Sequence, residues 1–340
     1  MIGIGTLIVL GWIGCGTKDQ TAEVNAASTQ LQQGSFSTAQ TSYDAILTAD
    51  ANNVDAAIQA AYVYLLQGQY DKSEAILNAV VTEDAAVQQD LQLRKAIVKI
   101  TAGQFDQAKD FAQQSNSDFG KIIAAEVSLL DGEVDDAIGF LEGVSSSQYK
   151  ILAKDYLSLL NSEYTALQDL AEAQASWALK EYRLAIDSAE TAFDSLKGNE
   201  EAKQAMNSRE DMTLLWASRA VVVGKPEIAT KILSTNTKYS SANEWRKESI
   251  EAMVLCANNQ VDEAVKIFAK LEQNVKHSGL HDAIATAVII IAEQNGDPTP
   301  LLSKLSGNSG ALAAWKAGNA QEATNLVDSA IFQRFLEGGL

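Results

Sequence analysis

Proline is scarce in this sequence, which contains only Pro226, Pro298 and Pro300 among 340 residues. Proline breaks helices because it lacks a backbone N–H and its ring clashes with the preceding turn. The long segments between clusters of glycine, asparagine and serine are rich in alanine, leucine, glutamine, glutamate and lysine, which favour helix. With 46% hydrophobic residues, the chain can form one large domain or two smaller ones. The composition therefore predicts an all-α protein.

Positive charge is also sparse, because 26 lysines and arginines face 44 aspartates and glutamates for a net charge of −18. The only basic runs are the pairs Arg94-Lys95 and Arg246-Lys247. A phosphate-binding surface needs clustered positive charge, so we expect no nucleic-acid partner. The acidity has two interpretations: a solvated, self-repelling surface, or an acidic face that selects a basic partner.

Cysteine and histidine occur only twice each. Cys15 ends an apolar N-terminal segment and Cys256 lies in a helical run, so we expect no disulfide and interpret Cys256 as a small buried hydrophobe. His277 and His281 have the i, i+4 spacing of metal ligands, but Gly279 between them indicates a turn. We predict exposed histidines and no metal site.

Motifs that carry catalysis are missing from the sequence. It has no G-x-x-x-x-G-K-[ST] loop, no G-x-S-x-G elbow and no C-x-x-C pair. Ser147 and Lys150 match the S-x-x-K pattern of serine acylases, but the K-T-G and S-D-N motifs that accompany it do not occur. We therefore predict no catalytic residue, no cofactor and no enzymatic activity.

The amino terminus has the outline of an export signal. Ile2 to Ile13 is apolar, Gly14-Cys15 follows, and polar residues begin at Thr17. The apolar stretch is too short to cross a bilayer, which needs about 20 helical residues. Gly14-Cys15 resembles the lipobox of bacterial lipoproteins, which implies that Cys15 becomes acylated after cleavage. Residues 1–14 would be the signal peptide and residues 15–20 the lipidated cysteine and a short tether.

The lipobox resemblance also implies a location. Gly16 stands where an aspartate would favour retention at the inner membrane of some bacteria, so we expect an outer-membrane anchor facing the periplasm. A secreted or short-anchored protein and a cytoplasmic protein are the alternatives.

A repeated pattern follows, in which a glycine precedes an apolar residue by two positions and a small residue by five. Its glycines are 34, 35 and 29 residues apart. Glycine adopts positive φ readily and so can close a helix before a tight turn, while the small residue lets two helices approach closely. The four clear copies are Gly34, Phe36 and Ala39; Gly68, Tyr70 and Ser73; Gly103, Phe105 and Ala108; and Gly132, Val134 and Ala137.

The pattern resembles the tetratricopeptide repeat, a unit of two antiparallel helices. Ala61, Tyr64, Gly68, Tyr70, Ser73, Leu77 and Val80 fall on its signature positions. The inter-repeat turn is visible as Asp50 to Asn53, although Ala51 replaces the usual proline. Because one hairpin cannot bury its apolar face alone, the resemblance implies an α-solenoid of stacked hairpins, a TPR-like superhelix.

Later copies are less regular. We predict an N-terminal array over residues 21–145, divergent or extended hairpins over 146–200, and a C-terminal array over 201–340. The polar stretch 197–211 is the candidate for an internal boundary or mobile loop. The series gives eight or nine hairpins, resuming at Lys180 and continuing through Gly224, Asn259, Gly296 and Gly318. Pro226 and Pro298 are expected to start second helices, with Asp297 as an N-cap.

The family's concave groove is lined by five positions of each repeat. By resemblance, it would contain Ile58, Tyr62, Leu65, Leu66, Leu93, Ile97 and Ile100. This apolar strip suits an amphipathic helix or an extended peptide. The alternative is that the N-terminal segment or solenoid packing covers these residues.

Together these features predict a lipid-anchored scaffold that binds proteins in a bacterial envelope assembly, such as pilus, secretion, polysaccharide-export or cell-wall machinery. The alternative is an envelope module that binds a glycan or small ligand on tryptophans such as Trp177, Trp216, Trp245 and Trp315.

Overall fold

The computed structural model describes residues 20–32, 35–196, 198–207, 209–236, 238–275 and 278–302. Within these ranges the regular secondary structure is entirely helical, which confirms the all-α prediction. None of the helices found there combines the length and the hydropathy that a membrane span requires. The predicted signal peptide with Cys15, and the predicted repeat at Gly318, lie outside the described residues.

The described residues form two compact units. The N-terminal unit holds residues 20–163 and 174–181, and the C-terminal unit holds 164–173 and 182–302. The N-terminal unit contains α1 (Thr21–Gln32), α2 (Phe36–Ala49), α3 (Val54–Leu66), α4 (Tyr70–Ala79), α5 (Ala85–Thr101), α6 (Phe105–Gln114), α7 (Asp118–Leu130), α8 (Val134–Glu142) and α9 (Ser147–Leu160). The C-terminal unit contains α11 (Tyr182–Ser195), α12 (Glu200–Asn207), α13 (Glu210–Val222), α14 (Pro226–Leu233), α15 (Glu244–Ala257), α16 (Val261–Asn274), α17 (Ser278–Glu293) and α18 (Thr299–Leu302), and α10 (Thr165–Ala178) contributes residues to both units.

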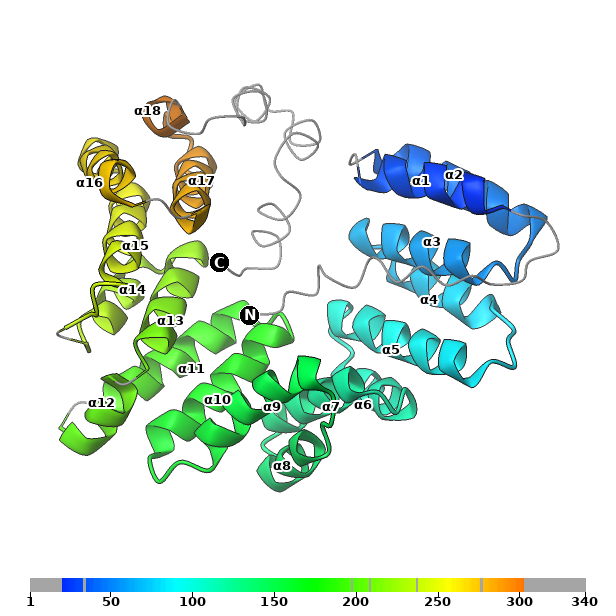
Figure 1. Cartoon of the computed structure of the whole chain (residues 1–340), viewed down its shortest axis with the longest axis horizontal. Helices are drawn as coiled ribbons and strands as arrows, with labels where there is room; N and C mark the ends of the chain where they lie inside the picture. Colours follow the sequence, from blue (N-terminus) through cyan, green and yellow to red (C-terminus); the bar gives the residue numbers. More distant parts are fainter. Residues whose placement is uncertain are drawn as a thin grey trace. The chain divides into compact units, whose positions relative to one another are not determined.

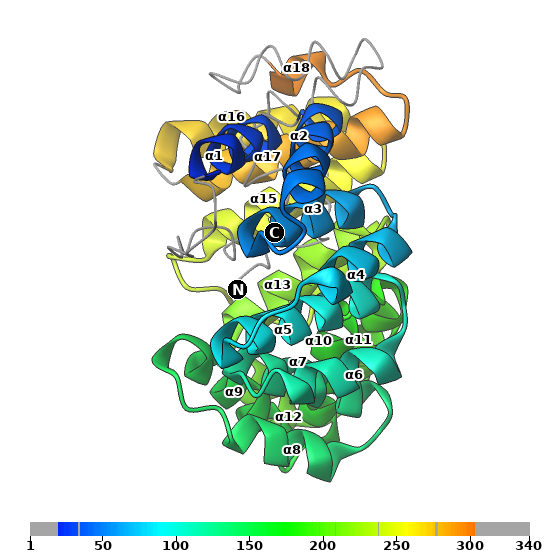
Figure 2. The same cartoon turned by 90° about the vertical axis from the view of Figure 1, so that its right-hand side faces the viewer.

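Successive helices pair as hairpins. In the N-terminal unit α1 packs on α2, α3 on α4, α5 on α6 and α7 on α8, and each hairpin touches the next (Figure 1). Seen from the side, α1 to α8 follow one another in the same order (Figure 2). In the C-terminal unit α13 pairs with α14 and α15 with α16. Both units are therefore stacks of helical hairpins, as the predicted α-solenoid requires.

Over residues 146–200, where divergent or extended hairpins are predicted, the chain forms α9, α10 and α11. The polar stretch 197–211 contains a further helix, α12, which the sequence pattern does not predict.

A left-handed residue ends the first helix of most hairpins. Gly68, Gly103, Gly132 and Gly224 have φ between 70° and 77°, as the glycine pattern predicts. Each glycine donates its N–H to the carbonyl three residues earlier, and the following residue donates to the carbonyl five residues before itself. This is the Schellman motif, which satisfies carbonyls that the helix end leaves free. The same two bonds and a positive φ occur at Lys180, Asn259 and Asn295.

Small residues bring the paired helices together. Ala61 on α3 and Ser73 on α4 are 2% and 0% exposed, so only their small side chains fit at this contact. The Ser73 hydroxyl donates to the Ala61 carbonyl over 2.7 Å, which satisfies a buried polar group. The large side chains of Tyr43 and Leu77 fill the adjacent core.

The loops between hairpins are held by side chains of the preceding hairpin. Asp118, the first residue of α7, accepts a 2.6 Å hydrogen bond from the Ser146 N–H just before α9. The hydrogen bond from the Lys121 ammonium, together with the bonds from this loop, holds the pKa of Asp118 well below its usual range. Glu210 at the start of α13 likewise accepts 3.0 Å bonds from the Ser240 N–H before α15. An acidic side chain thus anchors the entry of the next hairpin at both places.

The predicted helix starts are largely confirmed. Pro226 is the first residue of α14. Pro298 directly precedes α18, and the Asp297 carboxylate accepts a 3.0 Å bond from the Thr299 N–H as an N-cap does. The left-handed residue of this last turn is Asn295 and not Gly296.

Substituting alanine for two glycines tests the turn. A Cβ atom would meet no heavy atom within 4 Å at either Gly103 or Gly139, so only the backbone conformation distinguishes them. Gly103→Ala is expected to lower the free energy of unfolding by about 1–2 kcal/mol, because alanine resists positive φ. Gly139→Ala, inside α8, is expected to raise it by up to about 1 kcal/mol. Urea unfolding followed by circular dichroism measures both, and effects of equal sign would contradict this assignment.

Candidate functional site

The predicted groove residues of α3 lie along one helix with unequal exposure. Ile58, Tyr62 and Leu65 are half-buried, while Leu66 is 43% exposed. Tyr62 packs against the cluster formed by α1, α2 and α3, whereas Ile58 and Leu65 pack against the cluster formed by α3, α4 and α5. These side chains therefore cover the two clusters and keep part of their apolar surface accessible.

The residues of α5 divide between surface and core. Leu93 and Ile100 are only 7% and 6% exposed, because they belong to the cluster that joins α5, α6 and α7. Ile97 is half-buried at the edge of that cluster. The apolar surface that remains, called here the first-helix strip, consists of Ile58, Tyr62, Leu65, Leu66 and Ile97. Leu93 and Ile100 agree with the alternative that solenoid packing covers part of the groove.

Charged side chains lie in the first turn of α3 and on α5. Arg94 and Asp90 form an i, i+4 ion pair on α5 with 2.8 Å between Nε and Oδ2. Asp55 lies in the first turn of α3, where burial raises the pKa of its carboxyl and the charge of Arg94 opposes that rise. Charged groups of α3 and α5 therefore accompany the apolar first-helix strip on the same two helices.

On α7, Glu126 occupies the repeat position that Tyr62 and Ile97 of the first-helix strip occupy on α3 and α5. It precedes its left-handed turn residue by six positions, as Tyr62 and Ile97 do theirs. Its carboxyl is buried beneath α9 and accepts a 2.9 Å hydrogen bond from the Tyr156 hydroxyl. Burial raises the pKa of Glu126 to about 8, and the Tyr156 hydrogen bond opposes this rise. Nothing in the repeat pattern indicates a role for Glu126, because α9 lies outside the regular repeat.

The tryptophans proposed as stacking platforms are mostly internal. Trp216 is 0% and Trp177 6% exposed, so neither offers a ring face to a ligand, and Trp245 is half-buried. The Arg219 guanidinium lies 4.7 Å from the Trp216 ring centre. Trp315 lies outside the described residues. Packing is therefore the role of Trp177 and Trp216.

The remaining candidate residues are not assembled into a site. Ser147 and Lys150 are exposed on the first turn of α9, and His281 is exposed on α17, while His277 lies outside the described residues. Cys256 is fully buried, and burial raises the pKa of its thiol to about 12, as expected of a small hydrophobe. Within the described ranges, no group of three or more histidine, cysteine or acidic side chains is arranged to hold a metal ion.

Comparison with known proteins identifies the repeat. The family model described as tetratricopeptide repeat matches residues 30–89. A solved tetratricopeptide repeat protein from Parabacteroides merdae is 11% identical, with a TM-score of 0.36, over 80% of this chain and 86% of that one. The solved TPR domain of P58(IPK) is 14% identical, with a TM-score of 0.27, over 94% and 99%. No curated protein sequence matches the chain. At these TM-scores neither structure assigns binding residues to this chain.

The buried carboxyl predicts a pH dependence of stability. The folded state keeps the Glu126 proton up to about pH 8, whereas the unfolded chain releases it near its ordinary pKa of 4.5. Stability should therefore fall as pH rises from about 4.5 to about 8, because the unfolded state binds fewer protons in that window.

Glu126→Gln cannot ionise and keeps an acceptor for Tyr156. It should remove this loss, gaining on the order of a few kcal/mol relative to wild type between pH 5 and pH 8. Urea unfolding at several pH values measures the effect, with the exposed Glu142→Gln as control. Parallel pH profiles for wild type and Glu126→Gln would show that Glu126 ionises normally.

Proposed function

We propose, from the premise that this chain is a tetratricopeptide-repeat protein, that it is a protein-binding scaffold held at a bacterial envelope membrane by acylated Cys15. The observation that carries the binding role is the first-helix strip, whose five apolar side chains keep accessible surface on a hairpin stack. Such a strip suits the apolar face of an amphipathic helix or alternate side chains of an extended peptide.

The sequence of the amino terminus supports the anchor. Gly14-Cys15 follows an apolar segment too short to span a bilayer, and α1 begins at Thr21, six residues after the cysteine. Acyl chains contribute about 0.8 kcal/mol of membrane binding per buried methylene. A tether this short would hold the first hairpins near the lipid surface, where a partner in the same membrane is at high local concentration.

The envelope assembly served by such a scaffold is pilus, secretion, polysaccharide-export or cell-wall machinery, facing the periplasm from the outer membrane. A glycan-binding module is the second candidate, but the burial of Trp177 and Trp216 removes two of its four proposed platforms. No observation favours it over the scaffold.

The anchor is tested by metabolic labelling of the full chain with a clickable fatty-acid analogue in a bacterial host. Cys15→Ser should abolish labelling and move the protein from the membrane to the soluble fraction. Cys256→Ser is the matched control, because it removes a buried thiol and should leave the label unchanged. Equal labelling of wild type and Cys15→Ser, or no labelling of either, would contradict the proposed lipid anchor at Cys15.

The first-helix strip is tested by affinity capture from detergent-solubilised envelope. Leu66→Asp places a charge where an apolar partner would desolvate it, so recovery of specific partners should fall about tenfold. Leu184→Asp on α11 is the control, since Leu184 is 48% exposed against 43% for Leu66. Tyr62→Ala removes the aromatic ring of the same strip and should act in the same direction. If Leu66→Asp and Tyr62→Ala recover the same partners as wild type, the strip is not the binding surface.

A further inference from the structure

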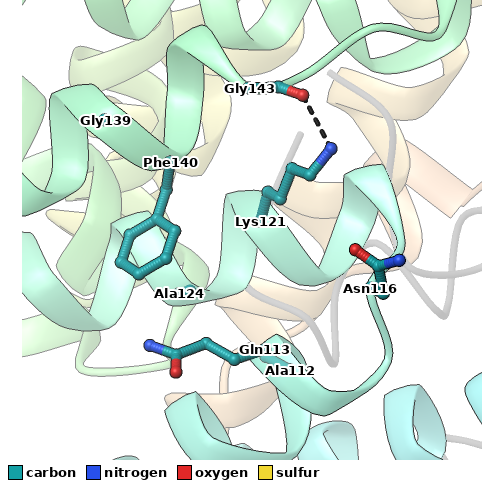
Figure 3. Close-up of a pocket in the computed structure, with 8 residues that line it drawn as sticks. All are labelled: Ala112, Gln113, Asn116, Lys121, Ala124, Gly139, Phe140 and Gly143. Atoms are coloured by element: carbon teal, nitrogen blue, oxygen red, sulfur yellow. Dashed lines mark hydrogen bonds between the residues drawn. The ribbon is translucent and has the colours of Figure 1, made fainter.

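A hollow opens on the second helices of the N-terminal unit, between α6, α7 and α8 (Figure 3). Its volume is about 340 Å³, at the low end of the range for binding pockets, which suits one or two side chains. Buried Ala112 and Ala124 form its apolar base, and the Phe140 ring forms one wall. The residues around it are Ala112, Gln113, Asn116, Lys121, Ala124, Gly139, Phe140 and Gly143.

Gly139 of α8 leaves one side of the hollow without a side chain. Glycine in the middle of a helix costs about 1 kcal/mol relative to alanine. No close contact requires glycine here, because a Cβ at this position would meet no heavy atom within 4 Å. The positions equally far beyond the left-handed turn in the two preceding hairpins are Ala75 and Asp110. Internal packing therefore does not explain Gly139, whereas a side chain received from outside would.

Groups that recognise a peptide surround the opening. The carboxamides of Gln113 and Asn116 lie at separate places around the hollow and make no hydrogen bond to any residue that the structure describes (Figure 3). The Lys121 ammonium donates to the Gly143 carbonyl at 2.7 Å and to Asp118 at 2.9 Å, which leaves its third donor for a ligand. Carboxamides donate and accept, so they match both groups of a peptide bond.

The helices that flank the hollow are strongly acidic. The two second helices beside it, α6 and α8, expose five carboxylates, whereas the one cation on these two helices, Lys109, is paired with Glu133 at 2.6 Å. A basic segment would be attracted to this face and an acidic one repelled. The five carboxylates belong to Asp106 and Asp110 on α6 and to Asp135, Asp136 and Glu142 on α8.

We propose that this hollow is a second protein-binding site, which receives one bulky apolar side chain from a basic peptide segment of a partner. The apolar side chain lies against Phe140 in the space that Gly139 leaves open. The peptide backbone meets Gln113, Asn116 and Lys121, and lysines or arginines on either side of the anchor face the carboxylates of α6 and α8. The site is formed by the second helices α6 and α8 together with α7 and contains none of the five residues of the first-helix strip, so it extends the proposed scaffold role to a separate surface.

Fluorescence anisotropy with the full chain tests the site. The probe is a labelled peptide of about ten residues with one phenylalanine between lysines and arginines. Gly139→Leu fills the hollow and should weaken binding at least about tenfold. Ala75→Leu places the same side chain at the equivalent exposed position of α4 and should leave binding unchanged. Replacing the phenylalanine of the probe by alanine should weaken binding about 30-fold, since a fully buried apolar side chain is lost.

Charge is tested with the same probe. Asp110→Lys combined with Asp136→Lys should weaken binding, and so should raised salt, while a peptide with glutamates in place of the basic residues should not bind. The proposal is overturned by equal affinity of wild type and Gly139→Leu, by equal binding of the acidic peptide, or by no saturable binding at about 1 mM. Because Leu66→Asp affects a different surface, loss of partners through Leu66→Asp with normal peptide binding would separate the two sites.

Discussion

The left-handed residue at the end of most first helices is the constraint on which the rest of the described structure depends. It reverses the chain within a few residues, so that the second helix must return along the first. Only then can Ala61 and Ser73 meet at the distance that their hydrogen bond records, and only then do the outer faces of consecutive first helices line up. Tyr62 and Ile97 of the first-helix strip each lie six residues before a left-handed residue, and Gly139 lies in the second helix that follows the left-handed Gly132.

The sequence predicts the turns well because a positive φ places a direct demand on residue type. Four glycines meet it, and asparagine is tolerated at Asn259 and Asn295 because its short polar side chain accepts this conformation. At the last turn the prediction is one residue off. Gly296 is glycine for a different reason, since a Cβ there would lie 2.8 Å from the Ile291 side chain. A glycine needed for space and one needed for φ are identical in sequence.

The candidate site was less predictable, because repeat position alone does not determine exposure. The repeat pattern places both Leu93 and Ile97 in the groove. Leu93 is nevertheless buried under α6 and α7, while Ile97 keeps accessible surface. Helix α9 covers Glu126, and the repeat period does not predict where α9 lies in the array. At the start of α7, Phe119 stacks on Tyr149 of α9 with 5.3 Å between ring centres, so α9 also occupies that end of the helix. Tertiary neighbours decide which first-helix positions remain open.

The acidic loop anchors have a consequence for the order in which the chain assembles. In each case the carboxylate belongs to the earlier hairpin and the backbone N–H to the loop that follows it, from Asp118 to Ser146 and from Glu210 to Ser240. During synthesis the acceptor leaves the ribosome before its donor, and domains fold from the N-terminus onward. At these two places the finished hairpin therefore presents a fixed acceptor for the loop that enters the next one, so that this part of the array can form before the residues beyond it are made.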